Sequence, residues 1–340
     1  MKNRQVLLKS YPQGKLTPAH FELSETNVPE LKDNEFLLRN HILSLDAGFR
    51  QWMNAGSGDN YLTAMALGAP VMSIVIGEIV KSNNSQFPVG QFILARTAWE
   101  EYSIGDGSDI ATPLDMSGDV PISLHAGMLG PTGMTAYFGM VEIGDVKKGD
   151  EVLISAAAGA VGAAAGQIAR IKGARVVGMA STDDKCQWLT NEVGFDDAFN
   201  YKDPAGLEAL IEEKLPNGID VFFDNVGGPV LDAAMGHLRE FSRIVLCGQI
   251  SSYNADGPMP GPSAEKMWEL ITKRTTMRGY MFSDYMDKAP DAFGDIVKWL
   301  QSGELKNFDQ ITDGVENTAQ AFCDMLDGKN RGKALVRLVS

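Results

Sequence analysis

The sequence predicts an α/β protein that combines a doubly wound parallel sheet with a second, β-rich domain. Its 340 residues suggest about two domains at ~150 residues each. Short apolar runs broken by Gly, Pro, Asn and Asp occupy residues 1–124. Residues 125–287 instead alternate apolar strand-length runs with helix-length periodic segments, which is typical of repeated βαβ units.

The first segment, 1–124, is expected to form a compact antiparallel, barrel-like domain. Its apolar runs have strand length and are separated by turn-forming residues. These runs are 5–8, 35–45, 71–80 and 92–95.

The second segment, 125–287, is expected to form the parallel sheet, with helices on both faces. Six strands in this rhythm fit the strand order of dinucleotide-binding domains. The predicted strands are 151–155, 175–179, 198–200, 219–224, 243–247 and 276–281. The predicted helices are 161–172, 183–193, 204–215 and 230–238.

The third segment, 288–340, is expected to return to the first domain and complete it. It carries two helical patterns, 291–301 and 318–326, and a final strand, 333–338.

Composition and charge argue against several classes of protein function and location. Asp and Glu outnumber Lys and Arg by 44 to 30, a net charge of −14, which argues against a nucleic-acid or anionic-membrane surface. No apolar run reaches the ~18 residues of a membrane span, and no signal-peptide pattern opens the chain, so a cytoplasmic location is expected. The three cysteines and four histidines show no disulfide or zinc-site spacing.

A small-residue turn carries the strongest functional signal. It reads Ala157-Ala158-Gly159-Ala160-Val161-Gly162 between a predicted strand and a predicted helix, which is the dinucleotide fingerprint with Ala in the first glycine position. Gly159 would let the backbone approach a pyrophosphate, and Gly162 would allow close packing of helix on strand. The alternative is that these small residues serve tight packing only.

The end of the second predicted strand indicates which coenzyme binds. An NAD enzyme usually places Asp or Glu about 20 residues past the turn, to bond the ribose 2′-OH. Here Ser181 stands at that place and Lys185 follows, a hydroxyl and an ammonium that suit the 2′-phosphate of NADP. Tyr201 could reach the same phosphate. In the opposing interpretation, Asp183 or Asp184 binds the ribose and Lys185 is a solvated helix residue.

At this point the chain resembles the medium-chain dehydrogenase/reductase superfamily, and within it the zinc-independent NADP-dependent alkenal/one oxidoreductases. That group includes prostaglandin reductase (leukotriene B4 12-hydroxydehydrogenase) and curcumin reductase. The resemblance covers nearly the whole chain. Its motifs are LDAGFR at 45–50, GMTAYFG at 133–139, AAAGAVG at 156–162, FNYK at 199–202, FDNVGG at 223–228 and CGQISSYN at 247–254.

The resemblance implies a Rossmann NADP-binding domain over 125–287 and a GroES-like substrate domain over 1–124. It also implies the residues that contact NADP(H). These are Gly159, Ala160, Val161, Gly162, Ser181, Lys185, Tyr201, Asn225, Cys247, Gly248, Ile250, Ser251, Tyr253, Tyr280, Met281, Phe282 and Asn330. Asn330 lies in the tail, so it would close the coenzyme from the other domain.

The resemblance also bears on metal chemistry. Zinc-dependent members of the superfamily use Cys and His ligands, whereas the matching region here reads Leu45-Asp46-Ala47, and the four-cysteine structural lobe is absent. A Lewis acid that polarises an alcohol is therefore missing, which favours reduction of an activated C=C bond. Close relatives often read Asp-Pro-Tyr-Met-Arg or Asp-Pro-Ala-Met-Arg where this chain has the segment that contains Phe49. The resemblance therefore does not identify the substrate.

The implied reaction delivers hydride from NADPH to the β-carbon of an α,β-unsaturated ketone or aldehyde. Negative charge then builds on the carbonyl oxygen, and Tyr253 is the candidate donor to it, with the coenzyme ribose hydroxyl as the competing donor. Phe49, Trp52 and Met259 are candidate walls of the substrate pocket. Arg50 is expected to be structural.

Two other functions stay open at this point. One is an NADPH:quinone oxidoreductase of the same fold, and the other is a catalytically silent NADP-binding protein. The expected partner is a small unsaturated carbonyl compound, with no nucleic acid and no membrane. Relatives imply a homodimer, joined through the edge strand at 276–281.

Overall fold

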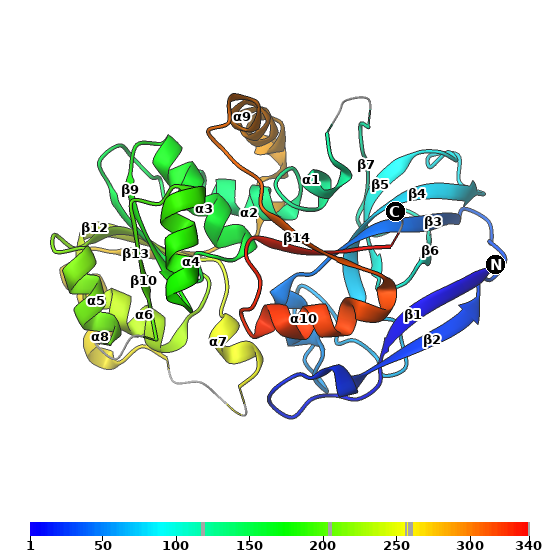
Figure 1. The fold of residues 1–340 in the computed structure, drawn as a ribbon, viewed down its shortest axis with the longest axis horizontal. Coiled ribbons are helices and arrows are strands. Elements are labelled where there is room, and N and C mark those ends of the chain that lie inside the picture. The colour runs from blue at the N-terminus through cyan, green and yellow to red at the C-terminus, as the bar shows by residue number, and fades with distance from the viewer. Residues whose placement is uncertain (117–119, 203–205, 256, 258–260, 339–340) are drawn as a thin grey trace. The chain divides into compact units, whose positions relative to one another are not determined.

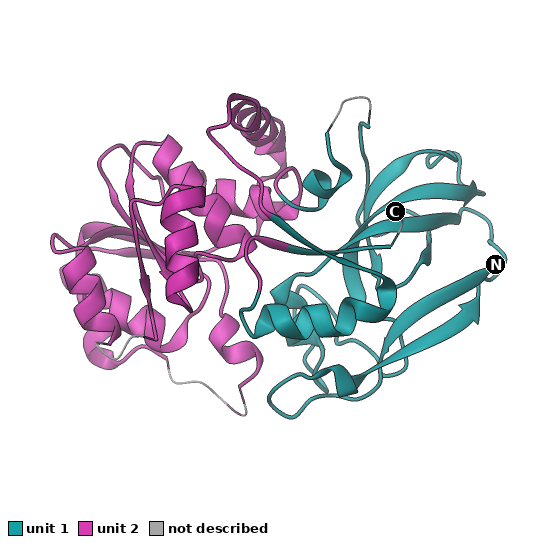
Figure 2. Ribbon diagram, viewed as in Figure 1, with its two compact units in different colours: residues 1–127, 309–329, 334–340 teal, residues 128–308, 330–333 magenta. Residues whose placement is uncertain are grey.

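The computed structural model describes residues 1–340 except 117–119, 203–205, 256, 258–260 and 339–340. The chain divides into two compact units (Figure 2). Unit 1 comprises residues 1–127, 309–329 and 334–340, and unit 2 comprises 128–308 and 330–333. Residues 288–308, expected to complete the first domain, cluster with unit 2.

Unit 1 is built on antiparallel sheet. A two-stranded ribbon pairs β1 (Lys2–Leu8) with β2 (Phe21–Asn27). A larger sheet has the order β14-β15-β3-β4-β5-β7, with β6 paired to β3. Its strands are β3 (Phe36–Ser44), β4 (Met72–Ser82), β5 (Phe92–Ala98), β6 (Tyr102–Gly105), β7 (Ala111–Pro113), β14 (Asp309–Asp313) and β15 (Lys333–Arg337).

Short helical segments connect and cover these strands. They are η1 (Pro18–His20), η2 (Ala47–Trp52), α1 (Ile122–Ala126), η6 (Val315–Asn317) and α10 (Thr318–Leu326). The apolar side chains of β3, β4 and β5 are almost all buried, and α10 adds Phe322, which lies edge-on to Trp99 at a ring distance of 5.2 Å. This core holds the unit together by burial of apolar surface.

Unit 2 contains the six-stranded parallel sheet (Figure 1). Its order is β10-β9-β8-β11-β12-β13, which places the first strand beside the fourth and confirms the predicted fold class. The strands are β8 (Glu151–Ile154), β9 (Arg175–Ala180), β10 (Asp197–Asn200), β11 (Ile219–Asp224), β12 (Leu238–Leu246) and β13 (Thr276–Gly279).

The helices of unit 2 connect these strands. They are α2 (Pro131–Phe138), η3 (Gly139–Ile143), α3 (Ala160–Ile171), α4 (Asp183–Trp188), η4 (Leu189–Val193), α5 (Leu207–Lys214), α6 (Gly228–Met235), α7 (Ile250–Tyr253), α8 (Ala264–Thr272), η5 (Phe282–Lys288) and α9 (Ala289–Ser302). Strands β8 and β11 are almost fully buried because helices cover both faces of a parallel sheet.

Two predicted boundaries differ from the structure. The predicted helix over 230–238 ends at Met235, and the chain is already extended at Leu238, where β12 begins five residues earlier than predicted. The predicted helix over 183–193 is α4 followed by a π-helical turn, and it ends at Gly194, whose φ of 95° suits glycine.

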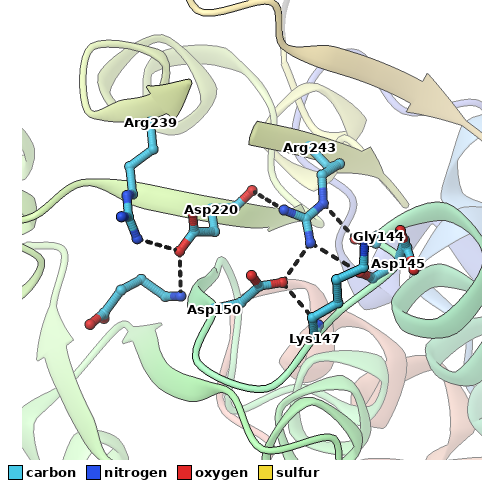
Figure 3. A network of polar contacts seen from close by, with 8 residues as sticks. Gly144, Asp145, Lys147, Asp150, Asp220, Arg239 and Arg243 are labelled. Atoms are coloured by element: carbon cyan, nitrogen blue, oxygen red, sulfur yellow. Dashed lines mark hydrogen bonds and ion pairs between the residues drawn. The ribbon is translucent and has the colours of Figure 1, made fainter. Parts of the chain in front are cut away.

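The amino-terminal ends of β8 and β11 are held by a polar network (Figure 3). The Arg243 guanidinium donates to the Asp150 carboxylate at 2.5 Å and to the Gly144 carbonyl at 2.8 Å. Arg239 donates to Asp220 at 2.8 Å. These contacts lie at the end of the sheet opposite the predicted coenzyme turn, so they stabilise the fold without taking part in the site.

Candidate coenzyme and active site

The predicted small-residue turn joins β8 to α3. Ala156 has a φ of +46°, an uncommon value for a residue with a Cβ atom, and α3 begins after Gly159. A Cβ at Gly162 would lie 2.5 Å from the Ala156 carbonyl oxygen and 2.8 Å from the Ala157 Cα, so the turn requires glycine there. The first backbone N–H groups of α3 then face the end of the sheet, where a helix start favours phosphate.

A buried carboxylate joins the ends of β8 and β11. Asp224 is fully buried and accepts hydrogen bonds from Ser155 Oγ at 2.8 Å, Val226 N at 2.9 Å and Gly227 N at 3.0 Å. Burial raises the pKa of Asp224 above its usual range, and the hydrogen bonds act in the opposite direction.

Ser155 extends this junction to Asn225, one of the predicted coenzyme contacts. The Asn225 backbone N–H donates to Ser155 Oγ at 2.8 Å, and its side-chain amide donates to the Ser155 carbonyl at 2.7 Å. The junction therefore fixes both the position and the rotamer of Asn225. Because β8 and β11 are the neighbours at which the strand order reverses, this is where a doubly wound sheet binds its ligand.

The loop after β12 is bonded to the same junction. Ile250 N donates to the Asn225 carbonyl at 3.1 Å, and Ser251 Oγ donates to the Val226 carbonyl at 2.5 Å. Tyr253 turns back, so that its hydroxyl accepts from Gln249 N at 3.2 Å. The structure thus brings a set of the predicted residues together beyond the carboxyl ends of β11 and β12. They are Asn225, Gly248, Ile250, Ser251 and Tyr253.

Cys247 and Tyr280 are both half-buried in unit 2. The Tyr280 hydroxyl donates to the Thr135 carbonyl at 2.6 Å. Burial raises the pKa of the Cys247 thiol to about 12, which leaves it uncharged and unreactive at neutral pH. Next to Tyr280, Met281 is exposed and Phe282 is half-buried at the start of η5.

Beyond the end of β9, Lys185 lies in a cationic setting. Only 8% of the residue is exposed, and its Nζ donates to the Asn330 carbonyl at 2.5 Å. Burial is the main cause that lowers the pKa of Lys185, and the charges of Arg331 and Lys202 lower it further. Ser181 precedes α4, whose start is capped by the next residue, Thr182.

The predicted contact Asn330 belongs to unit 2 itself, with residues 330–333, and does not reach it from the other unit. This short tail is fixed on the coenzyme turn, because Gly332 N donates to the Ala158 carbonyl at 2.9 Å. Tyr201 follows β10 and is 36% exposed; burial of its hydroxyl raises its pKa.

The candidate pocket residues Phe49 and Trp52 lie in unit 1, on η2. Both are 8% exposed, with their rings 6.2 Å apart, and Trp52 contacts the ring of Tyr61 at 5.8 Å. Arg50 is buried and donates to Asn54 Oδ1 at 2.9 Å and to the Gly14 carbonyl at 2.8 Å. Met259 lies outside the described residues.

Sequence reasoning missed Ser155, Asp224 and Arg331. Asp224 and Ser155 are strand-end residues whose pairing requires knowledge that β8 and β11 are neighbours. Arg331 follows Asn330 in the sequence. The predicted approach of the tail at Asn330 to the coenzyme was the sequence signal that could have identified it. In the described part of the chain, no group of three or more His, Cys, Asp or Glu is placed to hold a metal ion. None of the described helices is long and apolar enough to cross a membrane.

These residues fit a phosphorylated dinucleotide. The turn is closed to any side chain at Gly162, α3 begins directly after Gly159, and a buried ammonium at Lys185 lies beyond the next strand. Backbone N–H groups suit a pyrophosphate, and the cations suit a further phosphate.

Comparisons with known proteins agree with this geometry. The chain matches a family model described as the N-terminal domain of oxidoreductase over residues 4–112 and one described as zinc-binding dehydrogenase over 160–302. It is 39% identical to prostaglandin reductase 1 of Bos taurus, over 97% of each chain. It is 35% identical to the NADP(+)-dependent 2-alkenal reductase of Nicotiana tabacum, over 98% of this chain and 97% of the relative. The solved structure of CurA from Vibrio vulnificus in complex with NADPH superposes with a TM-score of 0.91 at 36% identity, over 99% of both chains.

Proposed function

We propose that this chain, which belongs to the medium-chain dehydrogenase/reductase family of oxidoreductases, uses NADPH to reduce the C=C bond of α,β-unsaturated ketones and aldehydes. One observation carries the proposal. The buried ammonium of Lys185 stands beyond β9, where an NAD enzyme would place a carboxylate on the ribose. Two relatives matched over nearly their whole length support it, one named prostaglandin reductase 1 and one named NADP(+)-dependent 2-alkenal reductase.

The coenzyme would be held by unit 2. The N–H groups at the start of α3, beyond Gly159 and Gly162, would bind the pyrophosphate, and Lys185 with Tyr201 would bind the 2′-phosphate. Asn225 and the loop 247–253 would position the nicotinamide end. When bound, NADPH supplies the hydride that the alkene accepts.

Tyr253 is the proposed electrophilic catalyst. Hydride addition at the β-carbon leaves negative charge on the carbonyl oxygen of the substrate, and a hydroxyl donor stabilises that charge. The Tyr253 hydroxyl accepts a hydrogen bond from Gln249 N, which orients it and increases its ability to donate its own proton. Phe49, Trp52 and Met259 are proposed as apolar walls for the substrate.

Loss of NADPH absorbance tests the proposal directly. We expect turnover with enones and enals, slower turnover with benzoquinones, and little with NADH. We expect Tyr253→Phe to lower kcat by about 100- to 1000-fold, the range measured when one donor to a developing oxyanion is removed. Turnover only on quinones would identify the rival reductase, and tight NADPH binding with no oxidation by either class would identify a silent protein.

A zinc-independent reaction is part of the proposal. Dialysis against a chelator is expected to leave enone turnover unchanged, whereas lost turnover restored by zinc would contradict it. The three cysteines are free thiols, which fits a reducing compartment such as the cytoplasm. Cell fractionation would test that location.

We also propose a homodimer joined at the β13 edge of the sheet. Strand β13 is the last in the sheet order, and helix α8 beside it has no buried residue. Trp268 is 61% exposed and Ile271 is 63% exposed, and Phe241, within β12, is 65% exposed. An open strand edge next to exposed large apolar side chains is typical of a surface that a second copy covers.

A further inference from the structure

Arg331 is a cationic residue next to the proposed 2′-phosphate site, and that site as described so far consists of Lys185 and Tyr201 and gives Arg331 no role. Its backbone is anchored on both sides. The carbonyl of Asn330 accepts from Lys185 Nζ at 2.5 Å, and Gly332 N donates to Ala158 in the coenzyme turn at 2.9 Å. The Arg331 side chain therefore starts from a fixed point between the glycine turn and Lys185.

The guanidinium of Arg331 contacts the carboxylate of Asp184, which is in the first turn of α4. The Arg331 side chain is 38% exposed and that of Asp184 is 77% exposed. Ion pairs this exposed contribute little to stability, typically ~0–1 kcal/mol, so an anion of higher charge can displace the carboxylate.

Lys202 completes a cluster of three cations from three separate segments. The Lys202 backbone N–H donates to Asn200 Oδ1 at 3.0 Å, and Asn200 Nδ2 donates to Asp183 Oδ1 at 2.9 Å. The charges of Lys202 and Arg331 both act on Lys185, so these three cations share one region with Asp183 and Asp184, a local excess of one positive charge in a chain of net charge −14. Such an excess is stabilised by a bound anion.

We propose that Arg331 leaves Asp184 to bind the 2′-phosphate of the coenzyme, so that Arg331 favours NADPH over NADH and Asp184, which competes with the phosphate, limits that preference. The inference rests on the proposed function and adds a specificity residue to it. A guanidinium binds two phosphate oxygens at once, which an ammonium cannot do. A phosphomonoester carries about −1.5 to −2 charges at neutral pH, more than the carboxylate it replaces.

The opposing interpretation keeps Asp184 as the ligand of an unphosphorylated ribose, with Arg331 as its neutralising partner. The two interpretations predict opposite signs for one substitution. If Asp184 competes with the phosphate, Asp184→Asn tightens binding of a 2′-phosphorylated nucleotide. If Asp184 binds the ribose diol, the same change weakens binding of a nucleotide that lacks the phosphate.

Calorimetric titration of the full chain with 2′,5′-ADP and with 5′-AMP tests this without turnover. We expect Arg331→Ala to weaken 2′,5′-ADP binding by about 10- to 100-fold, as for loss of a hydrogen-bonded charge, and to leave 5′-AMP binding unchanged. Arg331→Lys should retain part of the affinity, and Asp184→Asn should tighten 2′,5′-ADP binding by about two- to fivefold. Arg239→Ala is the matched control, since it removes an exposed arginine from an aspartate at the far end of the same sheet.

Each outcome decides between the alternatives. Unchanged 2′,5′-ADP affinity in Arg331→Ala, with wild-type preference for that nucleotide intact, would overturn the inference and leave the proposed function standing. Weaker 5′-AMP binding in Asp184→Asn would overturn it as well. A wild-type chain that binds 2′,5′-ADP no better than 5′-AMP would instead contradict the coenzyme of the proposed function. Equal thermal midpoints for all variants would exclude unfolding as the cause.

Discussion

Replacing Asp224 by alanine should destabilise unit 2 by about 3–6 kcal/mol. The change leaves the buried donor Gly227 N–H and the part-buried donor Val226 N–H without this acceptor, and it leaves the buried Ser155 Oγ–H with only the long contact to the Phe223 carbonyl at 3.5 Å. An unsatisfied buried donor costs ~1–3 kcal/mol, and the part-buried one costs less because water can reach it. Asp224→Asn keeps one oxygen acceptor, so about 1–2 kcal/mol is expected for it.

Urea denaturation followed by the fluorescence of Trp188, which is buried in unit 2, measures this loss. Asp232→Asn is the control, because the half-buried Asp232 accepts a solvent-exposed hydrogen bond from Ser263 N at 3.0 Å, so a change under about 0.5 kcal/mol is expected. Asn225 takes its position from the same junction, so NADPH affinity should fall in Asp224→Asn as well. A free energy of unfolding for Asp224→Ala within 0.5 kcal/mol of the wild-type value would refute the reasoning.

Three further predictions follow from the site and the surface. Because the pKa of Lys185 is lowered, the residue loses its proton at a lower pH than an ordinary lysine does. The affinity for 2′,5′-ADP should therefore fall as the pH rises from about 7 to 10. Lys185→Arg should abolish that fall, because arginine keeps its charge over this range. Titrations across this range measure it, and an identical fall in both proteins would count against the role. Gly162→Ala should lower the free energy of unfolding by about 1–3 kcal/mol and weaken NADPH binding, because the added Cβ would lie 2.5 Å from the Ala156 carbonyl oxygen. Wild-type NADPH affinity of this variant in an equilibrium titration would contradict the tight turn. Trp268→Glu should yield monomers in sedimentation at concentrations where the wild type is dimeric, and an unchanged dimer would place the interface elsewhere.

The parallel sheet was predictable because its strands are buried on both faces and read as continuous apolar runs, such as the residues of β11. The glycine turn was predictable because its spacing is a local property. Helix α8 was missed although Met267, Leu270 and Ile271 recur at the i, i+3, i+4 spacing of an amphipathic helix, so this element was predictable from the sequence.

The polar junctions could not be predicted from local pattern. Ser155 and Asp224 are 69 residues apart, and Lys185 and Asn330 are 145 apart, so their contacts exist only after the strand order and the return of the tail are known. The predicted roles of Tyr253, Asn225 and the other site residues remain predictions until nucleotide and substrate are bound.

The bond between Gly332 and Ala158 has a consequence for biosynthesis. Domains fold as they emerge from the ribosome, and the sheet of unit 2 can assemble while synthesis continues. The proposed pocket for the adenosine phosphate cannot close before segment 330–333 has been made, because that segment bonds to both Lys185 and the coenzyme turn. On the proposed function, a product truncated before Asn330 would fold its sheet and still fail to hold the coenzyme.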